Sequence, residues 1–89
     1  MASVRILLRA AADLEEAIAW CETRSPLAAR RFENALNAAL DRIAGMPEMY
    51  AVVNERARYR LCPVHKSHYV LVYRYDSEAD EVVIATVAD

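Results

Sequence analysis

The residues best suited to chemistry lie in one segment of the chain, residues 56–74. The segment has no carboxylate and carries five cations and two histidines, namely Arg56, Arg58, Arg60, Lys66, Arg74, His65 and His68. Its cations could clamp a phosphate while a histidine, which titrates near neutral pH, moves a proton. They could equally face an acidic protein surface, because the arginine fork pairs with carboxylates. The whole chain has a net charge of -2, which argues against sequence-specific or general nucleic-acid binding.

A metal site is the second chemistry to consider, because Cys62, His65 and His68 are closely spaced. Three ligands without a clear fourth are a weak basis for a zinc site. We therefore expect no metal and no other cofactor. The two cysteines do not make a disulfide framework, so a reducing cytoplasm is the simplest compartment. No uncharged stretch is long enough for a membrane span.

Hydrophobic periodicity predicts the elements that position these side chains. Alternation over residues 4–9 indicates a short strand, and helical spacing indicates a helix over residues 11–24. A second helix is expected from Pro26 to about Ala44, with Ser25 as its N-cap. The short connection makes the two helices an antiparallel hairpin.

The second half of the chain predicts strands. Residues 46–55 are expected to be irregular, and strands are expected over residues 58–62, 69–75 and 82–87. The apolar run of the middle strand predicts a central strand covered on both faces. Short loops favour an antiparallel meander. With the hairpin on one face, residues 1–89 are expected to form a single two-layer α+β domain of order β-α-α-β-β-β.

Three stretches of this chain resemble the RelE/ParE toxin superfamily. They are AADLEEA at residues 11–17, SPLAARRF at residues 25–32, and YRL at residues 59–61 followed by HYVLVYRY at residues 68–75. The resemblance implies the toxin of a type II toxin–antitoxin pair. Such toxins are held inactive by a cognate antitoxin that wraps the hairpin and the sheet. RelE-like members cleave mRNA on the ribosome, whereas ParE-like members inhibit DNA gyrase.

The same resemblance separates these two branches. RNA cleavage needs groups that move protons and stabilise phosphate charge. RelE-like toxins carry an arginine where this chain has Val70, and they carry a basic pair on the preceding strand. Here the pair aligns with Arg60 and Cys62, or after a shift with Arg58 and Arg60. We therefore expect no catalytic residues and a ParE-like gyrase inhibitor that acts by binding; the alternative is a RelE-like ribosome-dependent mRNA endoribonuclease.

Two sets of residues are candidates for partner binding. For the target they are Arg58, Arg60, His68, Tyr73 and Arg74, although a solvated sheet face explains the arginines equally well. For a ParD-like antitoxin they are Trp20, Ala28, Arg31, Ala35 and Arg42. Tryptophan is enriched at binding hot spots, and the alanines let another backbone approach closely. Packing within the protein is the alternative explanation for both. The expected assembly is a toxin–antitoxin hetero-oligomer.

The chain ends at Val87-Ala88-Asp89. ParE-like toxins usually continue past the last strand with a tail that bears histidine and arginine. This difference motivates a third hypothesis, a non-toxic module that only binds an antitoxin.

Overall fold

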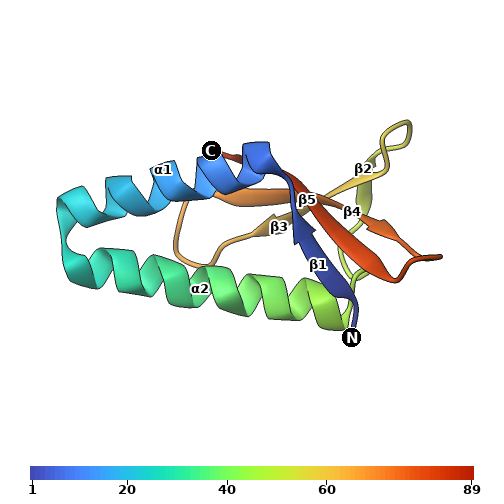
Figure 1. The fold of residues 1–89 in the computed structure, drawn as a ribbon, viewed down its shortest axis with the longest axis horizontal. Helices are drawn as coiled ribbons and strands as arrows, with labels where there is room; N and C mark the ends of the chain where they lie inside the picture. The colour runs from blue at the N-terminus through green and yellow to red at the C-terminus, as the bar shows by residue number, and fades with distance from the viewer.

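In the computed structural model, which describes residues 1–89, a helical hairpin covers one face of a five-stranded sheet (Figure 1). The helices are α1 (Leu8–Arg24) and α2 (Pro26–Gly45). The strands are β1 (Ser3–Ile6), β2 (Val52–Asn54), β3 (Tyr59–Pro63), β4 (Val70–Asp76) and β5 (Glu81–Ala88). The predicted α+β class is confirmed, and so is the β-α-α-β-β-β order once the short β2 is added to it.

The hairpin forms where the sequence predicts it, because Ser25 and Pro26 start a new helix. The Ser25 hydroxyl oxygen accepts a hydrogen bond from the Ala28 amide at 2.9 Å. The expected start of α1 at residue 11 is wrong by three residues. The Ala11 amide donates to the Leu7 carbonyl at 2.9 Å, so the helix already begins at Leu8. The strand expected over residues 4–9 is therefore too long, because β1 ends at Ile6 and Leu8 is helical, with a side chain that is 90% exposed.

The sheet has the order β1-β5-β4-β3-β2. The strands β3, β4 and β5 form the predicted antiparallel meander, and β1 pairs parallel with β5. The expectation that residues 46–55 are wholly irregular is wrong, because β2 pairs with β3 there. Its three residues and its shifted register are too little for periodicity to reveal.

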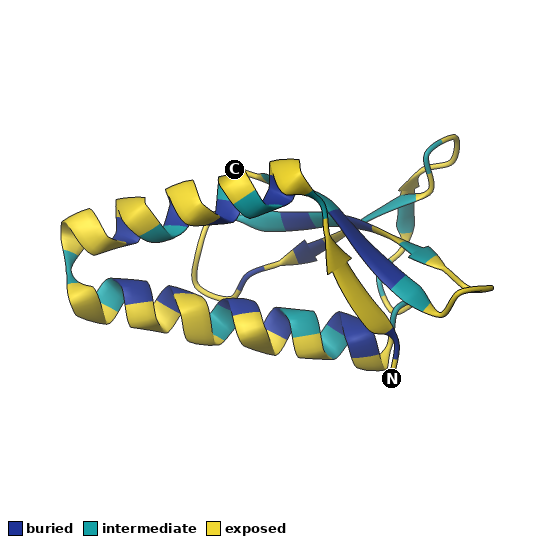
Figure 2. Cartoon of the chain, in the orientation of Figure 1, coloured by how far each residue is buried: buried dark blue, intermediate teal, exposed yellow.

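The core lies between the hairpin and the sheet, and its largest fully buried side chains include Tyr73, Ile43, Leu71 and Ile84. In Figure 2 the buried stripes of both helices turn toward the sheet. The expectation that β4 is covered on both faces is wrong. Leu71 and Tyr73 are fully buried, whereas their neighbours on the other face are half-buried or, at Arg74, exposed.

The end of β5 is tied to α1 through Asp13. Its carboxylate accepts hydrogen bonds from the Thr86 hydroxyl at 2.7 Å and from the Val87 amide at 3.1 Å. The Thr86 bond, with help from the Val87 amide, lowers the pKa of Asp13. These bonds fix α1 across the sheet and thereby position the residues that α1 carries toward its C-terminus.

Candidate functional site

The hairpin and the β3–β4 loop, residues 64–69, enclose a groove of about 1050 Å³. We call it the hairpin groove. Its lining comes from residues 20–25 of α1 and the turn, residues 28–42 of α2, and residues 65–69 of the loop. It includes every residue that the sequence proposed for antitoxin binding, namely Trp20, Ala28, Arg31, Ala35 and Arg42. Side chains from two helices thus meet a loop that is distant in sequence.

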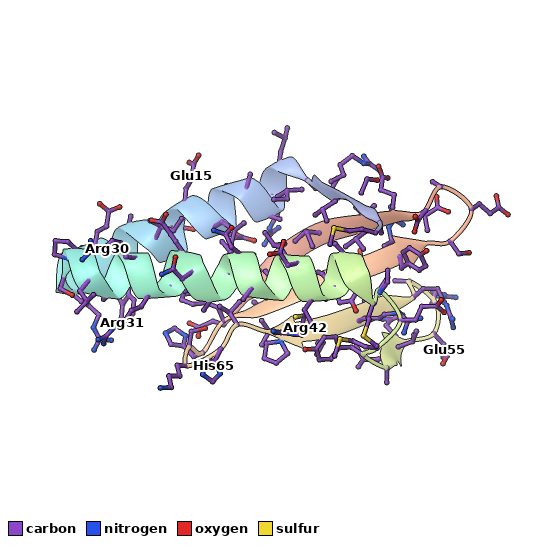
Figure 3. All side chains as sticks on the ribbon, turned by 90° about the horizontal axis from the view of Figure 1, so that it is seen from below. Glu15, Arg30, Arg31, Arg42, Glu55 and His65 are labelled. Carbon is purple, nitrogen blue, oxygen red and sulfur yellow. The ribbon has the colours of Figure 1, made fainter.

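The hairpin groove is cationic. Its lining carries four permanent cations, Arg24, Arg31, Arg42 and Lys66, together with His65 and His68, and no aspartate or glutamate. Figure 3 shows Arg31, Arg42 and His65 on the same side of α2, with Glu15 on the opposite side of the hairpin. A concave wall with charges of one sign focuses the electric field. The groove therefore attracts an anionic group.

The floor of the groove is apolar and shallow. Ala28 and Ala35 of α2 are half-buried, and Phe32 between them is buried. The Phe32 ring packs edge-on against Tyr69, with 5.4 Å between ring centroids. Small side chains above a fixed aromatic pair leave room for a partner backbone. The chemistry of the floor suits an apolar side chain, while the cations around it suit carboxylates.

Trp20 forms the rim of the groove near the end of α1. The Arg24 guanidinium lies 5.1 Å from the centroid of the Trp20 ring, and the His68 ring makes an edge contact with it at 5.6 Å. His68 is also paired with the Asp89 carboxylate and lies 4.4 Å from the Tyr69 ring. Trp20 is held by these contacts but remains 45% exposed. It offers a partner a large, already ordered apolar surface.

Arg42 both lines the groove and holds its loop. Its Nε donates to the Tyr50 hydroxyl at 3.1 Å, and its Nη2 donates to the Pro63 carbonyl at 3.5 Å. The hydrogen bond to Tyr50 is the main cause that raises the pKa of Arg42. The guanidinium therefore stays charged while it joins α2 to β3.

The residues proposed for target binding do not gather into one surface. Arg58 lies in the β2–β3 turn with a left-handed φ of 61° and pairs with Glu55 at 2.8 Å. The strand expected to begin at residue 58 begins at Tyr59, so Arg58 lies outside β3 and does not share a strand face with Arg60. Arg60 turns toward the loop after α2, where it donates to the carbonyls of Glu48 at 3.2 Å and of Tyr50.

Tyr73 belongs to the core. Its side chain is fully buried, and its hydroxyl donates to the Pro47 carbonyl at 2.9 Å. Burial raises the pKa of Tyr73 to about 12. Tyr73 therefore cannot touch a partner in this structure. The next residue, Arg74, is exposed on the face of the sheet that the helices leave open. Of the five target candidates, only His68 lines the hairpin groove.

The three side chains considered for a metal lie in different surroundings. Cys62 is fully buried, with its Sγ 3.8 Å from the Arg42 Nη2, whereas His65 and His68 line the groove. No three histidine, cysteine, aspartate or glutamate side chains are grouped to hold a metal ion.

Sequence reasoning missed Arg24 and Lys66 as groove residues. Arg24 follows Trp20 by four positions, which places both on one face of a helix, so its position could have been found. Lys66 has a left-handed φ of 56° in a loop, and no sequence signal fixes where such a loop lies.

Two comparisons bear on identity. A family described as "ParE toxin of type II toxin-antitoxin system, parDE" matches residues 4–89, which is almost the whole chain. The comparison with curated proteins found no match. Neither helix is long and apolar enough to cross a membrane.

Proposed function

This chain belongs to the ParE toxin family of type II toxin–antitoxin systems, and on that premise we propose that it inhibits DNA gyrase in the cytoplasm by binding it. We propose further that a ParD-like antitoxin neutralises it in a hetero-oligomer. The observation that carries the second part is the hairpin groove, which gathers all five antitoxin candidates from two helices.

The groove suits an antitoxin segment of defined chemistry. Carboxylates of the segment would pair with Arg24, Arg31 and Lys66, and its apolar side chains would rest on Ala28 and Ala35. A helix laid into a groove with an apolar stripe and flanking charges is a common recognition mode. Complementary charge mainly sets specificity and association rate, and buried aromatic anchors supply most of the affinity. Trp20 is the anchor in this proposal.

Inhibition by binding, rather than by RNA cleavage, is supported by the dispersal of the basic segment. Arg58 lies in a turn, Arg60 is bound to backbone carbonyls, and Arg74 is on the open face. A nuclease needs its phosphate clamp and its proton-transfer groups around one phosphate. Val70, at the position where RelE-like toxins carry an arginine, has no group that acts on phosphate.

Target binding is assigned to the exposed candidates that remain. Arg58 and Arg74 are exposed outside the groove, and His68 lies on its rim. We propose that gyrase and the antitoxin both contact His68. An antitoxin that fills the groove would then block the target directly, which gives neutralisation a simple steric basis.

A supercoiling assay with purified gyrase tests the proposal. The wild-type protein should inhibit supercoiling, and the cognate antitoxin should relieve that inhibition. Arg31→Glu should still inhibit but should escape the antitoxin, whereas Arg74→Glu should inhibit less and still bind the antitoxin.

Three results would each contradict a part of this proposal. An excess of folded protein that leaves gyrase untouched rules out the target. Cleavage of ribosome-bound mRNA, detected by primer extension, would favour the endoribonuclease. Antitoxin binding without any growth arrest would favour a non-toxic binding module.

A further inference from the structure

The outer edge of β1 carries unpaired backbone groups. On its inner side, the amides of Ser3 and Leu7 donate to the carbonyls of Asp80 and Ile84 at 3.1 and 3.0 Å. Successive residues of a strand point their backbone groups to opposite sides. Val4 and Ile6 therefore direct their N–H and C=O groups away from β5, where no strand follows in the sheet. An open edge of this kind is a template for another strand.

Apolar side chains line this edge. Four exposed large hydrophobic residues lie on β1 or beside it, namely Met1 at 90%, Val4 at 37%, Ile6 at 39% and Leu8 at 90%. Val4 and Ile6 pair in register with Val82 and Ile84, so they lie on the face of the sheet that carries the core. Figure 2 shows β1 exposed at the margin of the sheet. The core face thus continues past β5 onto β1, where the apolar side chains are covered only in part.

The charge on β1 does not protect this apolar side. Arg5 is the only charged residue of the strand, and alternation places it on the opposite face. Its Nε lies 3.3 Å from the Glu81 carboxylate. Edge strands commonly avoid association through charges that point into the path of a new strand. In β1 the Arg5 side chain lies on the opposite face and already pairs with Glu81, so it does not block a new strand.

We propose that β1 pairs antiparallel with β1 of a second copy of this chain, about a two-fold axis that passes beside Arg5. In this register Val4 lies opposite Ile6 of the second copy, and Ile6 lies opposite its Val4. The outward N–H and C=O groups of one β1 then face the outward C=O and N–H groups of the other β1. The exposed apolar side chains meet each other, and Leu8 comes next to the start of the other chain.

The structure allows only this two-fold register. An axis at Val4 would pair Ile6 with Ala2, which is buried and whose amide is bonded to the Ala44 carbonyl at 2.8 Å. An axis at Ile6 would pair Val4 with Leu8, which is already helical. The two Arg5 side chains meet on the open face, where the two Glu81 carboxylates offset their repulsion.

A second copy suits this edge because the strand is complementary to itself under that rotation. The two sheets would become one continuous sheet with both hairpins on the same face. No residue of β1 lines the hairpin groove, so both copies keep that groove free. This pairing requires neither gyrase nor an antitoxin.

Sedimentation of the full chain gives the first test. The wild-type protein should form a dimer that the Val4→Lys/Ile6→Lys variant loses, with an unchanged circular dichroism spectrum, because both side chains already reach solvent in the monomer. The matched control is Val53→Lys on β2 at the other edge of the sheet, 60% exposed in the monomer, which should leave the dimer intact. A monomeric wild-type protein at high micromolar concentration overturns the proposal. So does a monomer whose β1 variant binds an antitoxin more weakly, because the antitoxin would then be the occupant of this edge.

Cysteine cross-linking gives the register. Cα atoms of directly opposed residues outside the hydrogen-bonded pairs lie about 4.5 Å apart, within disulfide range. Arg5→Cys should therefore form a disulfide-linked dimer on mild oxidation. Ser3→Cys should not, and neither should the wild-type protein, whose Cys21 and Cys62 are buried. Equal cross-linking at residues 3 and 5 would show that the register is wrong.

Discussion

Arginine side chains have different roles in the hairpin groove and in the part of the sheet that lies under the loop after α2. In the groove, Arg24 and Arg31 extend along a concave surface without carboxylates. Under the loop, Arg60 and Tyr73 donate to the backbone carbonyls of residues 47–50. A cation without a carbonyl or carboxylate partner is available to another molecule, whereas one that donates to backbone carbonyls of its own chain holds the fold. The comparison teaches that partners within the chain decide the role of an arginine, more than its position in a basic segment.

The largest expected effect comes from removing the Tyr73 ring. Tyr73→Ala should lower the free energy of unfolding by about 3–5 kcal/mol, because the side chain is fully buried in the core. Urea denaturation measures this change. Tyr73→Phe keeps the ring and loses only the bond to Pro47, so it should cost about 1 kcal/mol. A loss below about 1 kcal/mol for the alanine variant would show that Tyr73 is not part of the packed core.

Arg60→Ala should lower the free energy of unfolding by about 2–3 kcal/mol, because carbonyls of the loop after α2 lose a charged donor. The control is Arg74→Ala on the open face, which should stay within about 0.5 kcal/mol of the wild-type protein. Chemical denaturation of both variants decides. Equal stability of the two would contradict the structural role of Arg60.

Stability at alkaline pH provides a third test of whether Tyr73 is a buried residue of the core. The pKa of Tyr73 is raised to about 12, whereas an unfolded tyrosine ionises near 10. Above pH 10 the unfolded state loses its proton first, so stability is complete below pH 10 and is lost as the pH rises toward 12. The loss from this group approaches about 2–3 kcal/mol at pH 12. Tyr73→Phe should show a smaller decrease in thermal stability over this window, and an equal decrease would contradict the assignment.

Substitution of Arg31 on the wall of the groove should change antitoxin binding and leave stability unaffected. Arg31→Glu should weaken the affinity for the antitoxin about tenfold to a hundredfold, because it places a carboxylate against an acidic segment. Isothermal titration calorimetry measures the change. The neighbouring Arg30 is exposed on α2 and does not line the groove, so Arg30→Glu is a matched control. Similar losses for the two variants would mean that net charge, rather than the groove, controls binding.

The smallest effect concerns the joint of the hairpin. Ser25→Ala removes the oxygen that accepts from the Ala28 amide, which should cost about 1 kcal/mol of stability. Because Ala28 lies on the groove floor, a small loss of antitoxin affinity should accompany it. Thermal unfolding and calorimetry together test this link, and an affinity loss larger than the stability loss would be inconsistent with a purely positional role.

That the five antitoxin candidates share one surface was predictable, because helical spacing determines which side chains lie on one face. Trp20 and the alanines of α2 could be placed on a surface from sequence alone, and the structure brings them together. The hairpin joint was equally clear, because serine followed by proline at a helix start has a direct physical cause. Local rules were sufficient for this half of the molecule.

The positions of the target candidates could not be predicted, for the opposite reason. Whether Tyr73 lies in the core or at the surface depends on which face of β4 the helices cover, and the apolar run does not reveal the face. Arg58 lies outside the expected strand because the β2–β3 turn gives it a left-handed conformation. Lys66 entered the groove through a loop whose path depends on Arg42 and Tyr69. Such positions follow from tertiary contacts, which no local pattern encodes.

Trp20 allows the most direct test, because it is the only tryptophan of the chain and it lies on the groove rim. Its fluorescence should change and saturate when the C-terminal segment of the antitoxin is titrated in, and Arg31→Glu should shift that titration to higher concentration. A complex that forms on size-exclusion chromatography without any change in Trp20 fluorescence would show that the antitoxin binds elsewhere.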